Sequence, residues 1–217
     1  MKGVAYMSRP KLLDLFCCAG GAAMGYYRAG FDVVGVDIKP QPRYPFQFVQ
    51  GDALEYVAKH GHEFDAIHAS PPCQGYSRMR HVTGKKYPLM IDEVRAVLRA
   101  TGKPYVIENV EDAPLIDDVL LCGTMFGLKT FRHRKFETSF FLLAPPHATH
   151  TVYGKAAKQG RPVTEERQYL TVTGNFSGIA NGKRAMGIEW MSRAELSQAI
   201  PPAYTEYIGR HLMEVLS

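Results

Sequence analysis

The sequence predicts one α/β domain, with a mostly parallel sheet that carries helices on both faces. Two observations lead to this fold class. Short apolar runs typical of strands alternate with segments whose apolar residues recur at helical spacing. A glycine-rich turn directly follows the first apolar run, as in α/β folds that bind a ligand at the ends of their strands. The 217 residues are enough to bury a substantial core.

The elements follow in order along the chain. Residue 52 is an aspartate placed to cap a helix, and Gly102 ends the next long helical pattern. Strands are expected at residues 11–17, 31–38, 46–50, 64–70, 104–110 and 139–144. Helices are expected after Gly20 as far as Gly30, from Asp52 onward, and at 87–102, 192–196 and 203–216.

Composition excludes several classes of protein. No apolar run approaches the ~18–20 residues of a membrane span, and the N-terminus lacks the pattern of a signal peptide, so we expect a cytoplasmic protein without membrane contact. The four cysteines suggest no disulfide framework, and cysteine and histidine do not fall at ligand spacing, so no metal is expected. The formal charge of +5 suits a polyanionic partner such as nucleic acid, and equally a generic basic protein.

The stretch "DLFCCAGGAAMG" places Gly20 and Gly21 between the first strand and the first helix. Glycines there let a ligand approach the backbone, although many such glycines only make a turn. The pattern differs from the dinucleotide motif G-x-G-x-x-G, which favours a nucleoside without a pyrophosphate. Asp37 ends the second strand and suits ribose hydroxyls, and Asp52 after the third strand is placed for an adenine amino group.

The stretch "ASPPCQGYS" holds Cys73 rigidly after two prolines at the end of a strand. Ligands bind at that edge of an open α/β sheet, and nearby helix ends are expected to lower the pKa of a thiol there. A buried structural cysteine is the alternative, but the polar residues that follow Cys73 argue against it.

Glu108 in "VIENV" ends the next strand and should share a crevice with Cys73. A carboxyl group in a partly desolvated cleft has a raised pKa and can carry a proton. In "FRHRKFE", Arg132 and Arg134 alternate along an extended segment, so both are expected to face one anionic or carbonyl-bearing ligand. An ordinary basic surface strand is the alternative.

Taken in order, these stretches resemble the cytosine-C5 DNA methyltransferase family, in particular its compact phage and prophage members. The resemblance covers roughly residues 11–140 and 190–215, and it is most specific in "PPCQ" followed by "ENV". It implies the Rossmann-like fold of S-adenosylmethionine-dependent methyltransferases and S-adenosylmethionine as cofactor. It also implies a core at residues 1–146, a reduced target-recognition insert at 147–188, and C-terminal helices at 189–217 that complete the core.

The resemblance assigns roles to single residues. Cys73 is the implied nucleophile, Glu108 the acid that contacts cytosine, and Arg132 and Arg134 help to hold the base. The implied cofactor site comprises Phe16, Ala19, Gly20, Gly21, Asp37, Ile38, Asp52, Ala53, Pro71 and Gln198. Contacts with nucleic acid are expected from Gln74, Ser77, Arg78, Arg80, Lys85, Lys86, Lys183 and Arg184.

The implied reaction is addition of the Cys73 thiolate to C6 of a flipped-out cytosine, followed by methylation at C5. Cys73 also distinguishes the chain from amino-group methyltransferases, which place an aromatic residue after the two prolines. Only about fifty residues separate Glu137 from Glu189. We therefore expect the specificity for a DNA sequence to be very short, relaxed, or supplied by a partner. Two alternatives stay open: the same chemistry on RNA or a free cytosine nucleotide, and a non-catalytic nucleic-acid-binding relative.

Overall fold

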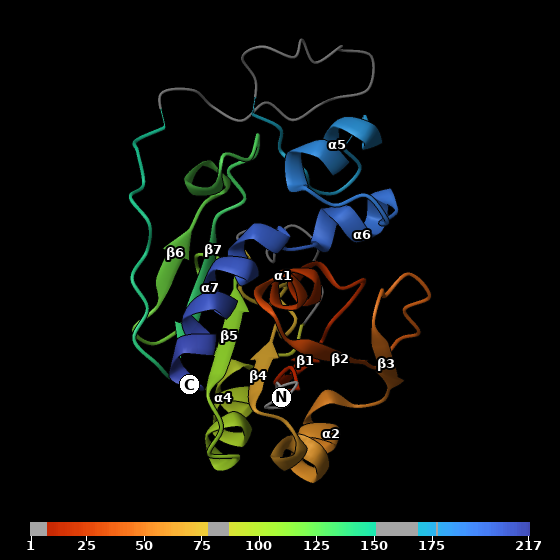
Figure 1. Cartoon of the computed structure of the whole chain (residues 1–217). Helices are drawn as coiled ribbons and strands as arrows, with labels where there is room; N and C mark the ends of the chain where they lie inside the picture. Colours follow the sequence, from red (N-terminus) through yellow and green to blue (C-terminus); the bar gives the residue numbers. More distant parts are fainter. Residues whose placement is uncertain (1–7, 78–86, 151–168, 177) are drawn as a thin grey trace, which may run out of the picture.

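A computed structural model describes residues 8–77, 87–150, 169–176 and 178–217. They form one seven-stranded sheet between two helical layers (Figure 1). The strands are β1 (Lys11–Leu15), β2 (Asp32–Asp37), β3 (Gln47–Gln50), β4 (Ala66–Ala69), β5 (Tyr105–Asn109), β6 (Val119–Leu121) and β7 (Arg134–Thr138). The helices are α1 (Gly21–Ala29), α2 (Ala53–His60), α4 (Ile91–Ala100), α5 (Ile179–Met186), α6 (Arg193–Gln198) and α7 (Pro202–Val215), with 3₁₀ turns η1 (Gly61–Glu63) and η2 (Gly123–Phe126).

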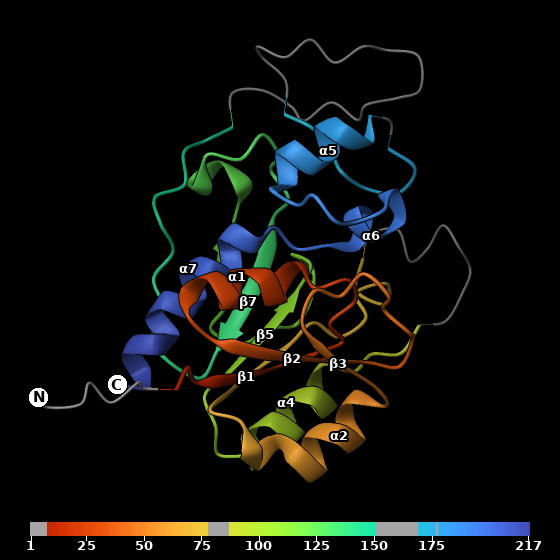
Figure 2. The same cartoon turned by 45° about the vertical axis from the view of Figure 1, so that its right-hand side comes forward.

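The strand order is β3-β2-β1-β4-β5-β7-β6, and the first five strands are parallel. β7 runs antiparallel to β5, and β6 antiparallel to β7. Helices α1 and α7 cover one face of the sheet, whereas α2 and α4 cover the other (Figure 2). The expected α/β fold with a mostly parallel sheet and helices on both faces is confirmed.

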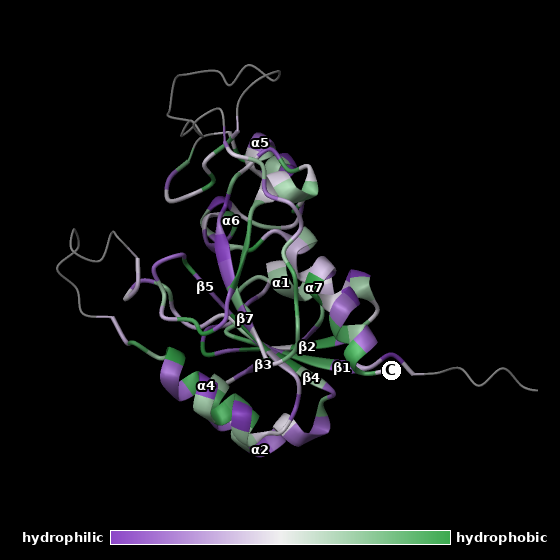
Figure 3. Cartoon of the chain, turned by 90° about the vertical axis from the view of Figure 1, so that its left-hand side faces the viewer, coloured by the Kyte–Doolittle hydropathy of each residue, from purple (hydrophilic) through white to green (hydrophobic). Residues whose placement is uncertain are grey.

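Two apolar clusters, one on each face, hold the layers together. Alternate residues of β1 point to opposite faces, so Leu12 packs with α1 and α7, whereas Leu13 and Leu15 pack with α2 and α4. Figure 3 shows β1, β2 and β4 as a mainly hydrophobic layer between the helices. This pattern is what two-sided burial of parallel strands requires.

A third cluster joins the C-terminal part of the chain to the first glycine turn. It contains Leu170, Val172, Phe176 and side chains from α5 and α6, and Ala19 belongs to it. Helices α5 and α6 therefore lie above the edge where the parallel strands end (Figure 1). Helix α5 was not expected from the sequence, which predicted only a loop-rich insert in this region.

The expected strand at residues 139–144 is wrong. β7 ends at Thr138, which pairs with Val106, and beyond it Ser139 exchanges two hydrogen bonds with Tyr105: Ser139 N–H to Tyr105 O (3.0 Å) and Tyr105 N–H to Ser139 Oγ (2.8 Å). β5 begins at Tyr105, so the following residues have no strand to pair with. Phe141 is accordingly 82% exposed. The strand that pairs with β5 is β7, which begins at Arg134 and lies just before residue 139.

Asp14 is a buried carboxyl group in the middle of β1. Tyr44 Oη donates to Asp14 Oδ2 at 3.4 Å, and Oδ1 has no hydrogen-bond partner among the described residues. Burial, reinforced by the negative charge of Asp37, raises the pKa of Asp14 to about 8, against the opposing effect of the Tyr44 hydrogen bond. Asp14 is therefore protonated in the folded protein at neutral pH.

We expect Asp14→Asn to remove a pH dependence of stability. The folded state holds the Asp14 proton up to about pH 8, whereas the unfolded chain releases it near pH 4. The stability that goes with the protonated Asp14 is thus fully present below pH ~4. As the pH rises from there to 8, the free energy of unfolding falls by about 1.4 kcal/mol per pH unit. Urea unfolding across this range should show wild type losing stability relative to Asp14→Asn. A parallel pH dependence of both proteins would contradict the assignment, and Asp32→Asn, at an exposed site, serves as control.

Candidate active site at the carboxyl edge of the sheet

The parallel strands end at a common edge, and most of the predicted site residues lie there. Leu15 of β1 is paired with Ala69 of β4, and Ala69 with Ile107 of β5. The loops that follow these strands, which carry the glycine turn, Cys73 and Glu108, therefore emerge side by side. Asp37 ends β2, which is also paired with β1. The expectation that these segments share one edge is confirmed.

Backbone hydrogen bonds hold the turn that carries Cys73. The N–H groups of Tyr76 and Ser77 donate to Cys73 O at 3.1 and 3.0 Å. Asn109 Nδ2 donates to the carbonyl of buried Pro71 at 2.9 Å, which ties the Pro-Pro corner to β5. The Ile91 N–H donates to Tyr76 Oη at 3.1 Å, so the turn is also attached to the start of α4. The thiol thus has a defined position without a regular element around it.

The Cys73 side chain is half-buried, and its environment does not lower its pKa as expected. Burial raises the pKa of Cys73, and the negative charge of Glu108 raises it further, whereas Arg134 and Arg132 oppose this shift. The expected lowering by helix ends is therefore wrong for the free protein, because desolvation dominates. Protonation of Glu108 would remove the negative charge that disfavours the Cys73 thiolate.

Glu108 is buried and forms an ion pair with Arg134 (Nε to Oε1, 3.0 Å). The antiparallel register explains the contact, because Asn109 at the end of β5 pairs with Lys135 beside Arg134. Burial raises the pKa of Glu108, and Arg134, the Ser70 hydroxyl and Arg132 each oppose that rise. The prediction of a raised carboxyl pKa is confirmed in direction.

A chain of buried polar groups extends from Glu108 into the core. The Ser70 side chain hydrogen-bonds Glu108, and Ser70 Oγ lies 2.9 Å from His68 Nε2. His68 Nδ1 in turn lies 3.0 Å from Tyr26 Oη. Burial lowers the pKa of His68 to about 3, so its imidazole is neutral and can donate one bond and accept the other. This chain orients the Ser70 hydroxyl toward the carboxylate.

Arg132 and Arg134 both lie close enough to affect the pKa of Glu108 and of Cys73, but the Arg132 guanidinium is buried against backbone and does not face a ligand as the alternation predicted. Arg132 precedes β7 and has φ 39°, so the extended geometry begins only after it. Its buried guanidinium donates to three backbone carbonyls: Ala199 O (3.0 Å from Nε and 2.7 Å from Nη2), Val172 O (2.8 Å) and Ser197 O (2.9 Å). Burial lowers the pKa of Arg132 to about 9. Arg132 thus holds the C-terminal segment against the site.

The glycine turn approaches that same C-terminal segment. Gly20 has φ 80°, which favours glycine, and a Cβ on Gly21 would lie 2.5 Å from Ile200 O. The close approach to residue 200 therefore requires glycine at position 21 even without a ligand. Trp190 Nε1 donates to Ala19 O at 2.8 Å and fixes the turn from the other side. Helix α1 begins here without a side-chain cap.

The remaining predicted cofactor residues lie around this turn. Asp37 Oδ2 accepts from the Cys18 N–H and Oδ1 from the Lys39 N–H, both at 3.0 Å. Ile38 beside it is 67% exposed. Asp52 caps α2, as predicted, because its Oδ1 accepts from Leu54 N at 2.8 Å and Glu55 N at 3.0 Å. Half-buried Phe16 follows β1, buried Ala53 begins α2, and exposed Gln198 ends α6.

The predicted nucleic-acid contacts are only partly within the described residues. Arg78, Arg80, Lys85 and Lys86 lie outside them. Gln74 is exposed and Ser77 half-buried, both beside Cys73. Lys183 and Arg184 lie on α5, where Lys183 Nζ donates to Glu189 O and Arg184 Nη2 to Asn181 Oδ1.

Several residues that shape the site were not expected from the sequence. Ser70 and His68 stand directly before the Pro-Pro-Cys turn, and Asn109 follows Glu108, so their proximity in sequence was a usable signal. Trp190 is the only tryptophan, but no local pattern connects it with Ala19. No metal ligands were expected from the sequence either, yet the fold brings Cys122 together with three histidines, because ligand spacing in sequence says nothing about contacts between distant segments.

We expect Arg132→Lys to destabilise the protein by about 2–4 kcal/mol, because a lysine cannot satisfy three carbonyls with one planar group. Urea unfolding measures this. Arg28→Lys, on the exposed face of α1, is the matched control and should stay within about 0.5 kcal/mol of wild type. Equal unfolding midpoints for Arg132→Lys and wild type would show that these hydrogen bonds do not hold the C-terminal segment.

Comparisons with known proteins cover the part of the chain that carries this candidate site. The C-5 cytosine-specific DNA methylase family matches residues 10–115, which include the glycine turn, Cys73 and Glu108. The Type II methyltransferase M.XorII of Xanthomonas oryzae pv. oryzae is 32% identical over 148 residues, covering 60% of this chain and 31% of that protein. M.AquIA of Picosynechococcus is 31% identical over 122 residues, covering 46% of this chain and 48% of the relative. The chain thus spans about a third to a half of these curated relatives.

The fold is shared over nearly the whole chain. The crystal structure of the S. pombe Dnmt2 methyltransferase superposes with a TM-score of 0.60 and 14% identity, covering 96% of this chain and 99% of that chain. Residues 10–115 thus match the C-5 cytosine-specific DNA methylase family, and the curated sequence relatives are methyltransferases of Type II.

Proposed function

We propose that the chain methylates C5 of cytosine in DNA through a covalent bond between Cys73 and C6 of the base. The observation that carries the proposal is the ion pair between buried Glu108 and Arg134 at the strand edge that also carries Cys73. An acid with a raised pKa, a cation and a thiol in one electrostatic environment are the groups that this addition needs.

Cofactor binding is part of the proposal, and the residues present fit S-adenosylmethionine. The exposed Ile38 offers an apolar surface beside the Asp37 carboxylate, a combination suited to a base and its ribose. The uncapped N-terminus of α1 offers N–H groups to a carboxylate, and Gln198 is adjacent to Ala199, which packs against Gly21. S-adenosylmethionine, when bound, supplies the methyl group that C5 accepts.

In the proposed mechanism the Cys73 thiolate adds to C6 of a cytosine flipped out of the duplex. The electrons of the C5–C6 double bond shift toward C5 and N3. Glu108 donates its proton to N3, which neutralises the negative charge that develops there. Arg134 stabilises the resulting Glu108 carboxylate and keeps it oriented. After C5 is methylated, N3 returns its proton to Glu108, and loss of the C5 proton to water restores the C5–C6 double bond and releases Cys73 as the thiolate.

The two arginines have different parts in this proposal. Arg134 contacts Glu108 directly and acts at the reacting base, whereas Arg132 is a positioning residue that acts through the carbonyls of Ser197 and Ala199. The exposed Gln74 and the basic residues of α5 are proposed to contact the nucleic acid. The segment 147–188 remains the proposed target-recognition insert.

Substrate and mechanism are tested with tritiated S-adenosylmethionine and duplex DNA, with single-stranded DNA, RNA and dCTP as competing substrates. Transfer to duplex DNA is expected. Preferred transfer to RNA or dCTP would move the same chemistry to another substrate, and DNA binding without any transfer would favour a non-catalytic relative.

DNA containing 5-fluorocytosine should trap wild-type protein covalently, because the adduct cannot lose fluorine from C5. Cys73→Ser should lose the adduct. Cys18→Ser removes an exposed thiol from the neighbouring turn and should retain it. An adduct on Cys73→Ser would overturn the assignment of the nucleophile.

We also expect Ser70→Ala to move the limb of the kcat/KM pH profile that depends on Glu108 to higher pH. The Ser70 hydrogen bond lowers the pKa of Glu108, so its loss lets Glu108 keep its proton at higher pH. A pH profile of methyl transfer measures the shift, and Ser70→Thr, which keeps a hydroxyl, should restore the wild-type profile. An unchanged profile in Ser70→Ala would mean that Glu108 does not act as the acid.

A further inference from the structure

A group of four potential metal ligands lies outside the proposed reaction. Cys122, His133, His147 and His150 each direct one ligand atom into a common space, and these atoms all lie within 4.8 Å of one another. Cys122 is the buried N-cap of η2, and His133 lies between Arg132 and Arg134. His147 and His150 follow Pro146 in an extended segment, so three separate parts of the chain meet here.

The distances agree with a tetrahedral centre. Cys122 Sγ lies 3.4 Å from His150 Nε2, and His147 Nε2 lies 2.9 Å from His150 Nε2. Zinc–sulfur bonds of about 2.3 Å and zinc–nitrogen bonds of about 2.0–2.1 Å separate tetrahedral ligands by about 3.6 Å for sulfur and nitrogen and about 3.3 Å for two nitrogens. These two pairs are within a few tenths of an ångström of the tetrahedral values, and the other pairs lie within 4.8 Å, so side-chain movements of about an ångström would complete the geometry.

His133 has the surroundings of a metal ligand. Its Nδ1 lies 3.3 Å from Glu111 Oε1, and its Nε2 is buried without a hydrogen-bond partner among the described residues. Histidines that bind metals typically donate the other ring N–H to a carboxylate, which leaves the free nitrogen as the ligand. The unpartnered Nε2 is thus explained by a metal ion in the common space.

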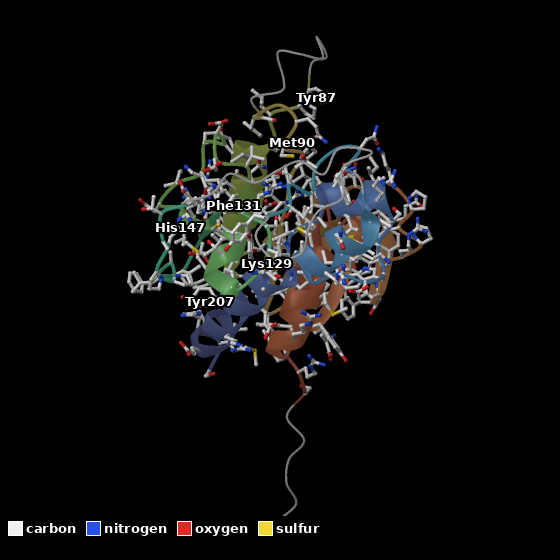
Figure 4. All side chains as sticks on the ribbon, turned by 90° about the horizontal axis from the view of Figure 1, so that it is seen from above. Tyr87, Met90, Lys129, Phe131, His147 and Tyr207 are labelled. Atoms are coloured by element: carbon white, nitrogen blue, oxygen red, sulfur yellow. The ribbon has the colours of Figure 1, made fainter. Side chains whose placement is uncertain are left out.

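The His150 imidazole is held in place by ring stacking. The His150 ring stacks on Phe131 with centroids 3.9 Å apart and planes at 16°, and on His133 at 5.0 Å and 21°. Phe131 and His147 lie on the same side of the molecule when it is viewed from above (Figure 4).

We propose that Cys122, His133, His147 and His150 bind one structural Zn²⁺ ion. One thiolate and three imidazoles are a ligand set that zinc accepts in tetrahedral geometry. Four protein ligands leave no open position for water or substrate, so the ion has a structural role. Binding releases the Cys122 thiol proton to solvent.

The ion would connect the segment at His147 and His150 to the turn before β7. That turn also carries Arg132, which holds the C-terminal segment, and Arg134, which contacts Glu108. The zinc site therefore supports the position of both arginines while contacting neither the base nor the cofactor. This separates the proposal from the proposed methyl transfer, since metal binding is measured without turnover.

The test uses the full chain, purified without a histidine tag or metal-chelating resin. Elemental analysis should find about one zinc per chain. Protein stripped with a chelator should bind added Co²⁺ and develop the visible bands of a tetrahedral ion together with a thiolate-to-cobalt charge-transfer band. Wild-type protein that contains no zinc after expression in zinc-supplemented medium, and that binds neither Zn²⁺ nor Co²⁺, would overturn the proposal.

Variants locate the ion. His147→Asn and His150→Asn lie near the surface, so folding should survive, and each should lower zinc affinity by more than about 100-fold, whereas Glu111→Gln should lower it by about 10–100-fold. Cys122→Ser should abolish the charge-transfer band. His62→Gln, an exposed histidine on η1, is the matched control and should bind zinc as wild type does. Unchanged zinc affinity in both His147→Asn and His150→Asn would also overturn the proposal.

Discussion

The ion pair between Glu108 and Arg134 is the interaction on which the candidate site depends. A buried carboxylate is costly unless it is paired or protonated, so the fold must supply a cation at the end of β5. It does so with an antiparallel strand, because β7 begins with Arg134 where β5 ends. A parallel strand in this place would put the start of β7 at the opposite edge of the sheet. The reversed direction of β7 is therefore a functional feature of the sheet.

Arg132, the buried arginine of the site, donates its hydrogen bonds to backbone carbonyls and not to an acidic side chain. Arg132 donates to three carbonyls between Val172 and Ala199, and Ile200 packs against Gly21. The same C-terminal segment supplies Trp190, which donates to Ala19 O. The proposed base site and the proposed cofactor site are thus held to one another by chain that is remote from both in sequence. Displacement of this segment would affect both sites together.

Burial has opposite consequences for the two reactive groups. It raises the pKa of Glu108 and so helps it to carry a proton, but it also raises the pKa of Cys73 and suppresses the thiolate. The two groups are coupled, because the Glu108 carboxylate is one cause of the raised thiol pKa. A protonated Glu108 would therefore serve both needs of the proposed mechanism, since it is the proposed acid and its protonation removes a negative charge near the sulfur. In this way activation of the thiol is linked to the protonation state of its neighbour.

The sequence by itself determined the features that depend on local pattern. Alternating strands and helices predicted the α/β fold, Asp52 was recognised as a helix cap, and "PPCQ" with "ENV" indicated the family that matches residues 10–115 and the edge of the sheet where these motifs lie. These signals work because strand ends, caps and tight turns are specified by residues close together in the chain.

No helix in the described part of the chain is long and apolar enough to cross a membrane.

Only the tertiary structure decided the features that depend on distant contacts. Residues 139–144 are apolar enough for a strand, yet β5 offers them no partner beyond Thr138. The direction of the Cys73 pKa shift follows from burial, and the position of Arg132 from carbonyls some forty and more residues away in sequence. Cys122 and the three histidines meet for the same reason. Desolvation and contacts between remote segments are properties of the folded chain, so no local pattern of residues encodes them.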